Sequence, residues 1–202
     1  MVKRAGKLFI EGGGDSNDLQ AECRNTFRNL LEKAGLKGRL PRIIAAGPRE
    51  GAYRDFCSFF SDGTVRAFLL VDSEGPVSAT SPWEHLKQRD KWEKPPRATD
   101  DQCHLMVQCM ETWFLADPPA LQTFFGQGFA PKSLPAHANI EDAPKTEVLA
   151  GLEAATAQTK TKGEYDKGAH SFKVLGTLDP AKVRQRSKWA ERFFATMERV
   201  LE

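Results

Sequence analysis

The five consecutive apolar residues of the segment AFLLV, Ala67–Val71, constrain the fold more than any other stretch of the sequence. A strand with one face in water alternates apolar and polar residues, whereas an unbroken apolar run is typical of a strand buried on both faces. Strands of that kind lie in parallel sheets that helices cover on each side. The segment therefore predicts an α/β fold.

The segments that precede this run agree with that expectation. A short apolar strand, 8–10, leads into a stretch with helical spacing of apolar residues, 17–34, which Gly35 ends. A second strand, 41–47, leads into a second helical stretch, 50–60. The order strand, helix, strand, helix, strand predicts a mostly parallel sheet with right-handed crossovers.

The second half of the sequence is mainly helical in character. A polar loop broken by prolines, 93–101, precedes the segment HLMVQCMETWFLAD, 104–117, which predicts a fourth strand running into a short helix. A further loop is expected around TKGEYDKGAH, 161–170. The three helices expected beyond Pro118 span residues 119–125, 145–157 and 187–201.

The length of 202 residues suits one globular unit better than two. We expect an α/β core over residues 1–118, with a helical C-terminal extension over residues 119–202 packed on it. The net charge of +2 gives no global electrostatic case for binding nucleic acid or membranes, so a site for a polyanion needs a local cluster. Because no stretch approaches the ~18 apolar residues of a membrane span, we expect a cytoplasmic protein that binds no membrane.

Acidic residues follow the predicted strands. Glu11 comes directly after the strand at 8–10, Asp72 and Glu74 follow the run at 67–71, and Glu111 lies near the junction after the fourth strand. Ligands of open α/β sheets bind at the carboxyl ends of the strands, so these acids are expected to converge. Converging carboxylates repel unless a cation neutralises them, and hard oxygen ligands suit Mg²⁺ or Mn²⁺. Such a site favours phosphoryl transfer.

Two structural alternatives remain open for this region. Acids at strand ends are often solvated, or cap the next helix, as Asp15 and Asp18 would before Leu19. The three glycines of EGGGD, 11–15, match neither phosphate-binding motif GxxxxGK[ST] nor GxGxxG. These glycines are Gly12, Gly13 and Gly14. They either bring backbone N–H groups to a substrate phosphate or only make a tight turn.

The segment EGGGD matches an EGxxD/E pattern, and the segment DSE, 72–74, stands where a DxD pattern is expected. Together these two segments resemble the Toprim metal-binding domain. That domain occurs in topoisomerases, primases and the overcoming-lysogenization-defect nucleases. The segment METWFLAD, 110–117, resembles the ExWLL motif of small stand-alone Toprim-like proteins, which are the RloB-like group and the domain-of-unknown-function family numbered 4276. The tail Tyr165–Ser187 also resembles the latter family, so the likeness covers nearly the whole chain.

The resemblance implies a Toprim-like, Rossmann-like sheet of about four strands flanked by helices. It implies that Glu11 acts as a metal ligand or general acid/base and that Asp72 and Glu74 bind the metal. Glu74 departs from the second aspartate that the pattern expects, and its extra methylene shifts or loosens the metal position. Asp15 would add a ligand through water.

The same resemblance assigns roles to three later residues. Glu111 would take part in catalysis, whereas Trp113 would pack in the core. Lys167 would meet a substrate phosphate as a point charge, and its alternative is an ordinary solvated loop lysine.

We therefore expect a Mg²⁺- or Mn²⁺-dependent nuclease that cleaves nucleic-acid phosphodiesters, with DNA preferred over RNA. The resemblance implies an effector of bacterial anti-phage defence that works with an ATPase partner of the ABC or AAA type. Two alternatives remain: a non-catalytic Toprim-fold subunit that binds an ATPase partner or nucleic acid, and a metal-dependent phosphohydrolase that acts on nucleotides.

Overall fold

The structure is a computed structural model of the 202-residue chain, and it describes residues 6–61 and 66–201. Its centre is a four-stranded parallel sheet with the strand order β2-β1-β3-β4. The strands are β1, Lys7–Ile10; β2, Arg42–Ala45; β3, Ala67–Asp72; and β4, Cys103–Met106. The predicted α/β class and the predicted parallel sheet are both confirmed.

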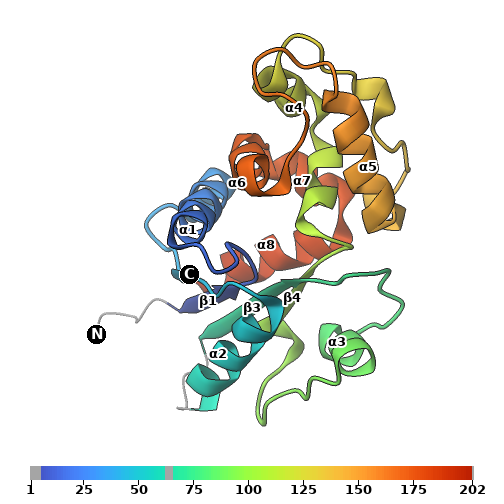
Figure 1. The fold of residues 1–202 in the computed structure, drawn as a ribbon. Coiled ribbons are helices and arrows are strands. Elements are labelled where there is room, and N and C mark those ends of the chain that lie inside the picture. Colours follow the sequence, from blue (N-terminus) through green and yellow to red (C-terminus); the bar gives the residue numbers. More distant parts are fainter. Residues whose placement is uncertain (1–5, 62–65, 202) are drawn as a thin grey trace.

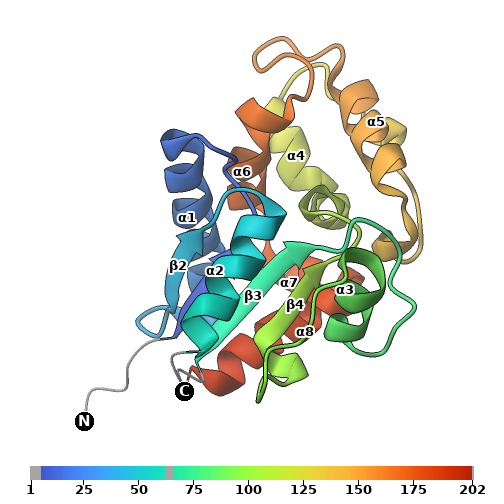
Figure 2. The same cartoon turned by 60° about the horizontal axis from the view of Figure 1, so that its bottom comes forward.

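Helices cover both faces of the sheet, as Figures 1 and 2 show. On one face lie α2, Arg49–Ser61, and α3, Pro82–Asp90, while α1, Asn17–Leu31, and α8, Lys188–Val200, lie on the other. The side chains of β3 alternate between two hydrophobic clusters, with Leu69 in the cluster on the α2 face and Leu70 in the cluster on the α1 face. Every residue from 67 to 71 is fully buried, which explains why this strand lacks a polar alternation.

The C-terminal helices continue the layer that contains α1 and α8. They are α4, Pro118–Phe125; α5, Lys145–Thr156; α6, Lys167–Thr177; and α7, Pro180–Arg186. Helix α6 packs on α1, and α7 packs on α8. Figure 1 shows α4, α5 and α6 on the side of the sheet opposite to α2.

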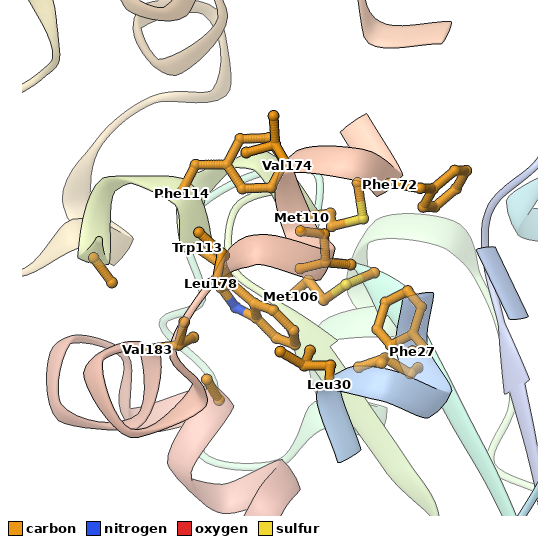
Figure 3. Packing of buried hydrophobic residues seen from close by; sticks show 14 of the residues in the cluster. Phe27, Leu30, Met106, Met110, Trp113, Phe114, Phe172, Val174, Leu178 and Val183 are labelled. Carbon is orange, nitrogen blue, oxygen red and sulfur yellow. The ribbon is translucent and has the colours of Figure 1, made fainter. Parts of the chain in front are cut away.

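One hydrophobic cluster links the strands with these helices. Figure 3 shows Trp113 among Leu30 of α1, Met106 of β4 and Leu178 after α6. The expected core position of Trp113 is confirmed, because its side chain is fully buried.

The expected loop at 161–170 is wrong in its second half. Helix α6 begins at Lys167, because the side chain of Asp166 accepts a hydrogen bond from the N–H of Ala169 and so caps the helix. Helix α7 is not predicted by the sequence pattern, since its seven residues are too few to show a period. Its start is nevertheless marked by Asp179 as N-cap and Pro180 as the first helical residue.

In the ranges that the structure describes, no helix has both the length and the apolar character needed to cross a membrane.

Candidate metal centre

Three carboxylates meet at the carboxyl edge of the sheet. Glu11 follows β1, Asp72 ends β3, and Glu74 lies in the turn after β3; each offers one oxygen atom within 4.8 Å of the other two. Strands β1 and β3 are parallel neighbours, with Ile10 paired to Leu70, so their ends emerge side by side. The predicted convergence of these three acids is confirmed.

Asp72 is the most buried of the three, with 5% of its surface exposed. Its Oδ1 accepts a hydrogen bond of 2.8 Å from the N–H of Met110, and its own N–H donates to Oε2 of Glu11 at 3.1 Å. Burial, and then the nearby charges of Glu11 and Glu111, raise the pKa of Asp72 well above its ordinary value. A cation bound here would oppose each of these effects.

The pKa of Glu11 is also raised. Burial raises the pKa of its carboxyl group, although Arg49 and the N–H of Asp72 act to lower it. In both carboxyl groups, burial disfavours the negative charge more than the neighbouring cations and hydrogen bonds favour it.

Glu74 is held in an unusual backbone conformation, with a φ of 60° in the left-handed region. Its N–H donates to the carbonyl of Gln108 at 2.8 Å. Both carboxylate oxygens accept hydrogen bonds from Nζ of Lys145, at 2.6 Å and 2.7 Å. This lysine, the first residue of α5, is a member of the site that sequence reasoning missed.

Arg49 is a second missed member. As the first residue of α2, it donates to the main-chain oxygen of Asp72, and its Nη1 lies 3.4 Å from Oε2 of Glu11. Asp90 holds the same guanidinium group at 2.7 Å, and the ring of Trp92 lies 4.8 Å from it. Arg49 follows β2 closely, so applying the strand-end argument to that strand would have found it.

Glu111 lies deeper than the three acids and outside their group. Its side chain is fully buried in a short 3₁₀ helix, Met110–Ala116. Oε1 accepts hydrogen bonds of 3.3 Å from Tyr165 and Ser171 and lies 3.2 Å from Nζ of Lys167. Oε2 has no hydrogen-bond partner within the described ranges. Glu111 is near enough to raise the pKa of Asp72, but its direct contacts are with α6 and the loop before it.

The alternative interpretation of Lys167 is wrong about the loop but right about solvent, because its side chain is 55% exposed. Lys167 is the first residue of α6 and forms an ion pair with Glu111. Burial acts to lower its pKa, but Glu111 and Asp72 outweigh burial, and the pKa of Lys167 is raised. Lys167 therefore carries a positive charge beside the acids.

The structure places Asp15 away from the three acids. Its side chain is exposed in the turn before α1, and it is not part of the carboxylate group. Neither Asp15 nor Asp18 caps that helix, because Ser16 accepts the hydrogen bond from the N–H of Leu19.

The glycine turn shapes a cavity beside the acids. Gly13 has a φ of 84°, and a Cβ atom at this position would lie 2.6 Å from the backbone of Gln20. The N–H of Gly12 donates to the carbonyl of Gly47 at 2.9 Å, so this group is already satisfied and does not face a substrate phosphate. The cavity has a volume of about 310 Å³, and its lining includes Glu11, Gly12, Gly13, Gly14, Asp72, Met110, Lys167, Gly168, Ser171 and Phe172.

The donor set fits a hard divalent cation. All three acids offer carboxylate oxygen, and the group contains no cysteine or histidine that would favour zinc. Glu11, Asp72 and Glu74 are thus the residues that would hold Mg²⁺ or Mn²⁺.

Comparison with known proteins gives one match. The model of a family described as "Domain of unknown function (DUF4276)" matches residues 10–198, a range that includes every acid of the site. No curated protein and no solved structure matches the chain.

Proposed function

The chain belongs to the DUF4276 family, and from the acidic site that it carries we propose a metal-dependent nuclease with a Toprim-like centre that cleaves nucleic-acid phosphodiesters. The observation that supports this proposal is the convergence of Glu11, Asp72 and Glu74 at the carboxyl ends of adjacent parallel strands. Carboxylates in this position hold Mg²⁺ or Mn²⁺ in many enzymes that act on phosphate esters.

The residues of the site have separate tasks in this proposal. A bound Mg²⁺ or Mn²⁺ would polarise the phosphodiester, activate the water that attacks the phosphorus and stabilise the charge of the leaving oxygen. Asp72 and Glu74 hold the cation. Glu11 lies beside the other two acids at the end of β1 and acts as a third metal ligand or as the general acid/base. Lys167 attracts the phosphate at the wall of the cavity.

Cleavage assays test the proposal directly. Wild-type protein with Mn²⁺ is expected to cleave DNA, with RNA assayed in parallel, and Glu11→Gln and Asp72→Asn are each expected to lower the rate by about a hundredfold or more. Both variants keep the shape of the side chain and remove its charge. If wild-type protein cleaves neither polymer, and if the two variants change no measurable property, the proposal is wrong.

A second candidate is a phosphohydrolase that acts on nucleotides. The cavity beside the acids, at about 310 Å³, is at the lower end of the ~300–1,000 Å³ that ligand pockets span, which favours a single nucleotide as its occupant. Release of phosphate from mononucleotides without nicking of polymers would support this function over the nuclease.

A non-catalytic subunit is the third candidate, and the ion pair between Lys145 and Glu74 favours it, because this lysine occupies a proposed metal ligand. Calorimetric titration separates it from the enzymes: a catalytic site binds Mn²⁺ and loses the ion on Asp72→Ala.

The cytoplasmic, anti-phage setting and the ABC- or AAA-type ATPase partner are also proposals. Co-purification of the chain with an ATPase from its native cells tests them.

A further inference from the structure

The ion pair between Lys145 and Glu74 joins the C-terminal helices to the metal ligands. The two residues are 71 positions apart, and their side chains are 27% and 21% exposed. Nζ lies within 2.7 Å of both carboxylate oxygens, so the ammonium group takes the place on Glu74 that a cation would need.

Neither partner of this pair is explained by local stability. Lys145 is the first residue of α5, where the helix dipole disfavours a positive charge, and its N-cap, Pro144, supplies no side-chain hydrogen bond. Glu74 has a left-handed backbone, which is unfavourable for a glutamate. Residues that break two local preferences in order to meet are typical of functional sites.

The other two cations of the site are held differently. Arg49 is fixed by Asp90, by the main-chain oxygen of Asp72 and by the ring of Trp92, so it stays in place when Glu11 binds another ion. Lys167 pairs with Glu111, which lies outside the group of three acids. In the described part of the chain, by contrast, the Lys145 ammonium group donates hydrogen bonds to Glu74 alone, and it acts on Glu11 and Asp72 only through its charge.

The charge balance shows what would change if a divalent cation replaced the ammonium group of Lys145 at Glu74. Without a metal, four carboxylates (Glu11, Asp72, Glu74 and Glu111) outnumber the three cations Arg49, Lys145 and Lys167 when all are ionised. A phosphodiester is repelled by such a site. One divalent ion reverses the sign of the total, and the release of Lys145 from Glu74 frees its ammonium group to meet a phosphate.

We propose that Lys145 is an exchangeable counter-ion: a divalent cation displaces its ammonium group from Glu74, and the freed group binds a phosphate of the nucleic-acid substrate. This inference rests on the proposed nuclease function and adds an order of binding to it, with the cation before the nucleic acid. Lys145 is a positioning residue in the metal-free protein and a phosphate ligand in the complex.

Titration with Mn²⁺ alone tests the first half of the exchange. Lys145→Met keeps the length of the side chain but removes the charge, so it is expected to bind Mn²⁺ at least about tenfold more tightly than wild-type protein. Lys145→Arg keeps the competing charge and is expected to stay near the wild-type affinity. Lys87→Met is the matched control, because Lys87 also pairs with a glutamate, Glu93, but does so on the exposed surface of α3.

Binding of a labelled oligonucleotide tests the second half. Ca²⁺ serves as the probe, since it is a hard divalent ion of the same charge. At one fixed salt concentration, wild-type protein is expected to bind the oligonucleotide at least about tenfold more tightly with Ca²⁺ than without it. Lys145→Met is expected to lose most of this gain, and Lys87→Met to keep it.

The outcomes separate this inference from the proposed function. Equal Mn²⁺ affinity in wild-type protein and Lys145→Met, or weaker binding by the variant, overturns the exchange and leaves the metal site intact. Absence of Mn²⁺ binding in both proteins overturns the proposed metal site together with the exchange. If circular dichroism shows that Lys145→Met does not fold, the wild-type oligonucleotide measurement decides, because no gain with Ca²⁺ overturns the proposal by itself.

Discussion

Two charged clusters of the molecule differ in the sign of the charge at their centre. One is the α7–α8 cluster, in which Arg184 of α7 binds Glu191 and Glu198 of α8. The other is the strand-end site of Glu11, Asp72 and Glu74. In the α7–α8 cluster, one guanidinium group lies between two carboxylates and binds both of them. In the strand-end site, carboxylates lie next to one another, and the cations surround them.

The pKa values of the two clusters follow this difference. Hydrogen bonding to Arg184 lowers the pKa of Glu191, whereas burial and neighbouring carboxylates raise the pKa of Asp72. The α7–α8 cluster therefore stabilises the charged form of its carboxylate Glu191. The strand-end site disfavours the charged form of Asp72, and carboxylates with such raised pKa values are common in sites that bind a ligand.

The largest expected effect is on metal affinity, which should fall when the strand-end site is changed and stay the same when the α7–α8 cluster is changed. Asp72→Ala removes a central oxygen ligand and is expected to weaken Mn²⁺ binding by about a hundredfold or more, since even residues that only orient metal ligands contribute ~10–100-fold. Arg184→Met is expected to leave Mn²⁺ binding unchanged. Titration calorimetry checks both, and an equal loss in the two variants would contradict the assignment of the site.

A smaller effect is expected in the pH dependence of stability without metal. The folded-state pKa of Asp72 is raised, so its favourable contribution is present at low pH and is lost as pH rises from the ordinary value toward the raised one. Over that range the free energy of unfolding is expected to fall by up to ~1.4 kcal/mol per pH unit for this group. Urea unfolding between about pH 4 and pH 8 measures the slope.

Asp72→Asn serves as the comparison for that measurement. The variant cannot ionise, so its free energy of unfolding is expected to depend less on pH and to exceed the wild-type value at neutral pH. A steeper slope in the variant than in wild-type protein would show that Asp72 does not carry the raised pKa.

The smallest expected effect concerns the α7–α8 cluster. Arg184→Met is expected to lower the free energy of unfolding by about 1 kcal/mol, because its two ion pairs are partly exposed. The contribution of Glu191 has the opposite pH dependence to that of Asp72: it is present above the ordinary pKa of glutamate and is lost as pH falls. Thermal melts of wild-type protein and Arg184→Met at neutral and acidic pH check this prediction. An equal loss of stability in the variant at both pH values would argue against the ion pairs.

Local pattern was enough to predict the sheet and the central acids. The run at 67–71 shows burial on both faces, and the acids that follow β1 and β3 must emerge at one edge once the strands are parallel. This is why Glu11, Asp72 and Glu74 were predicted as one group; Glu111 was predicted with them, and the structure places it outside the group. Asp15 was included on the basis of a motif alone, and the turn directs it to the surface.

The cations of the site show where such reasoning ends. Lys145 reaches Glu74 across 71 residues, and Arg49 reaches Glu11 across 38 residues. The strand-end argument places Arg49 at the correct edge of the sheet, but no local pattern specifies which acid it meets or points to Lys145, because both contacts depend on how α2 and α5 pack against the end of the sheet.

The sequence by itself determined the α/β class, the parallel sheet and the three acids at its carboxyl edge, because hydrophobic periodicity and strand direction are local properties. Only the tertiary structure decided which cation pairs with each acid: Arg49 with Glu11, Lys145 with Glu74 and Lys167 with Glu111. These pairs join elements far apart in the chain, so the charge that a metal ion and a phosphate would meet is set by packing.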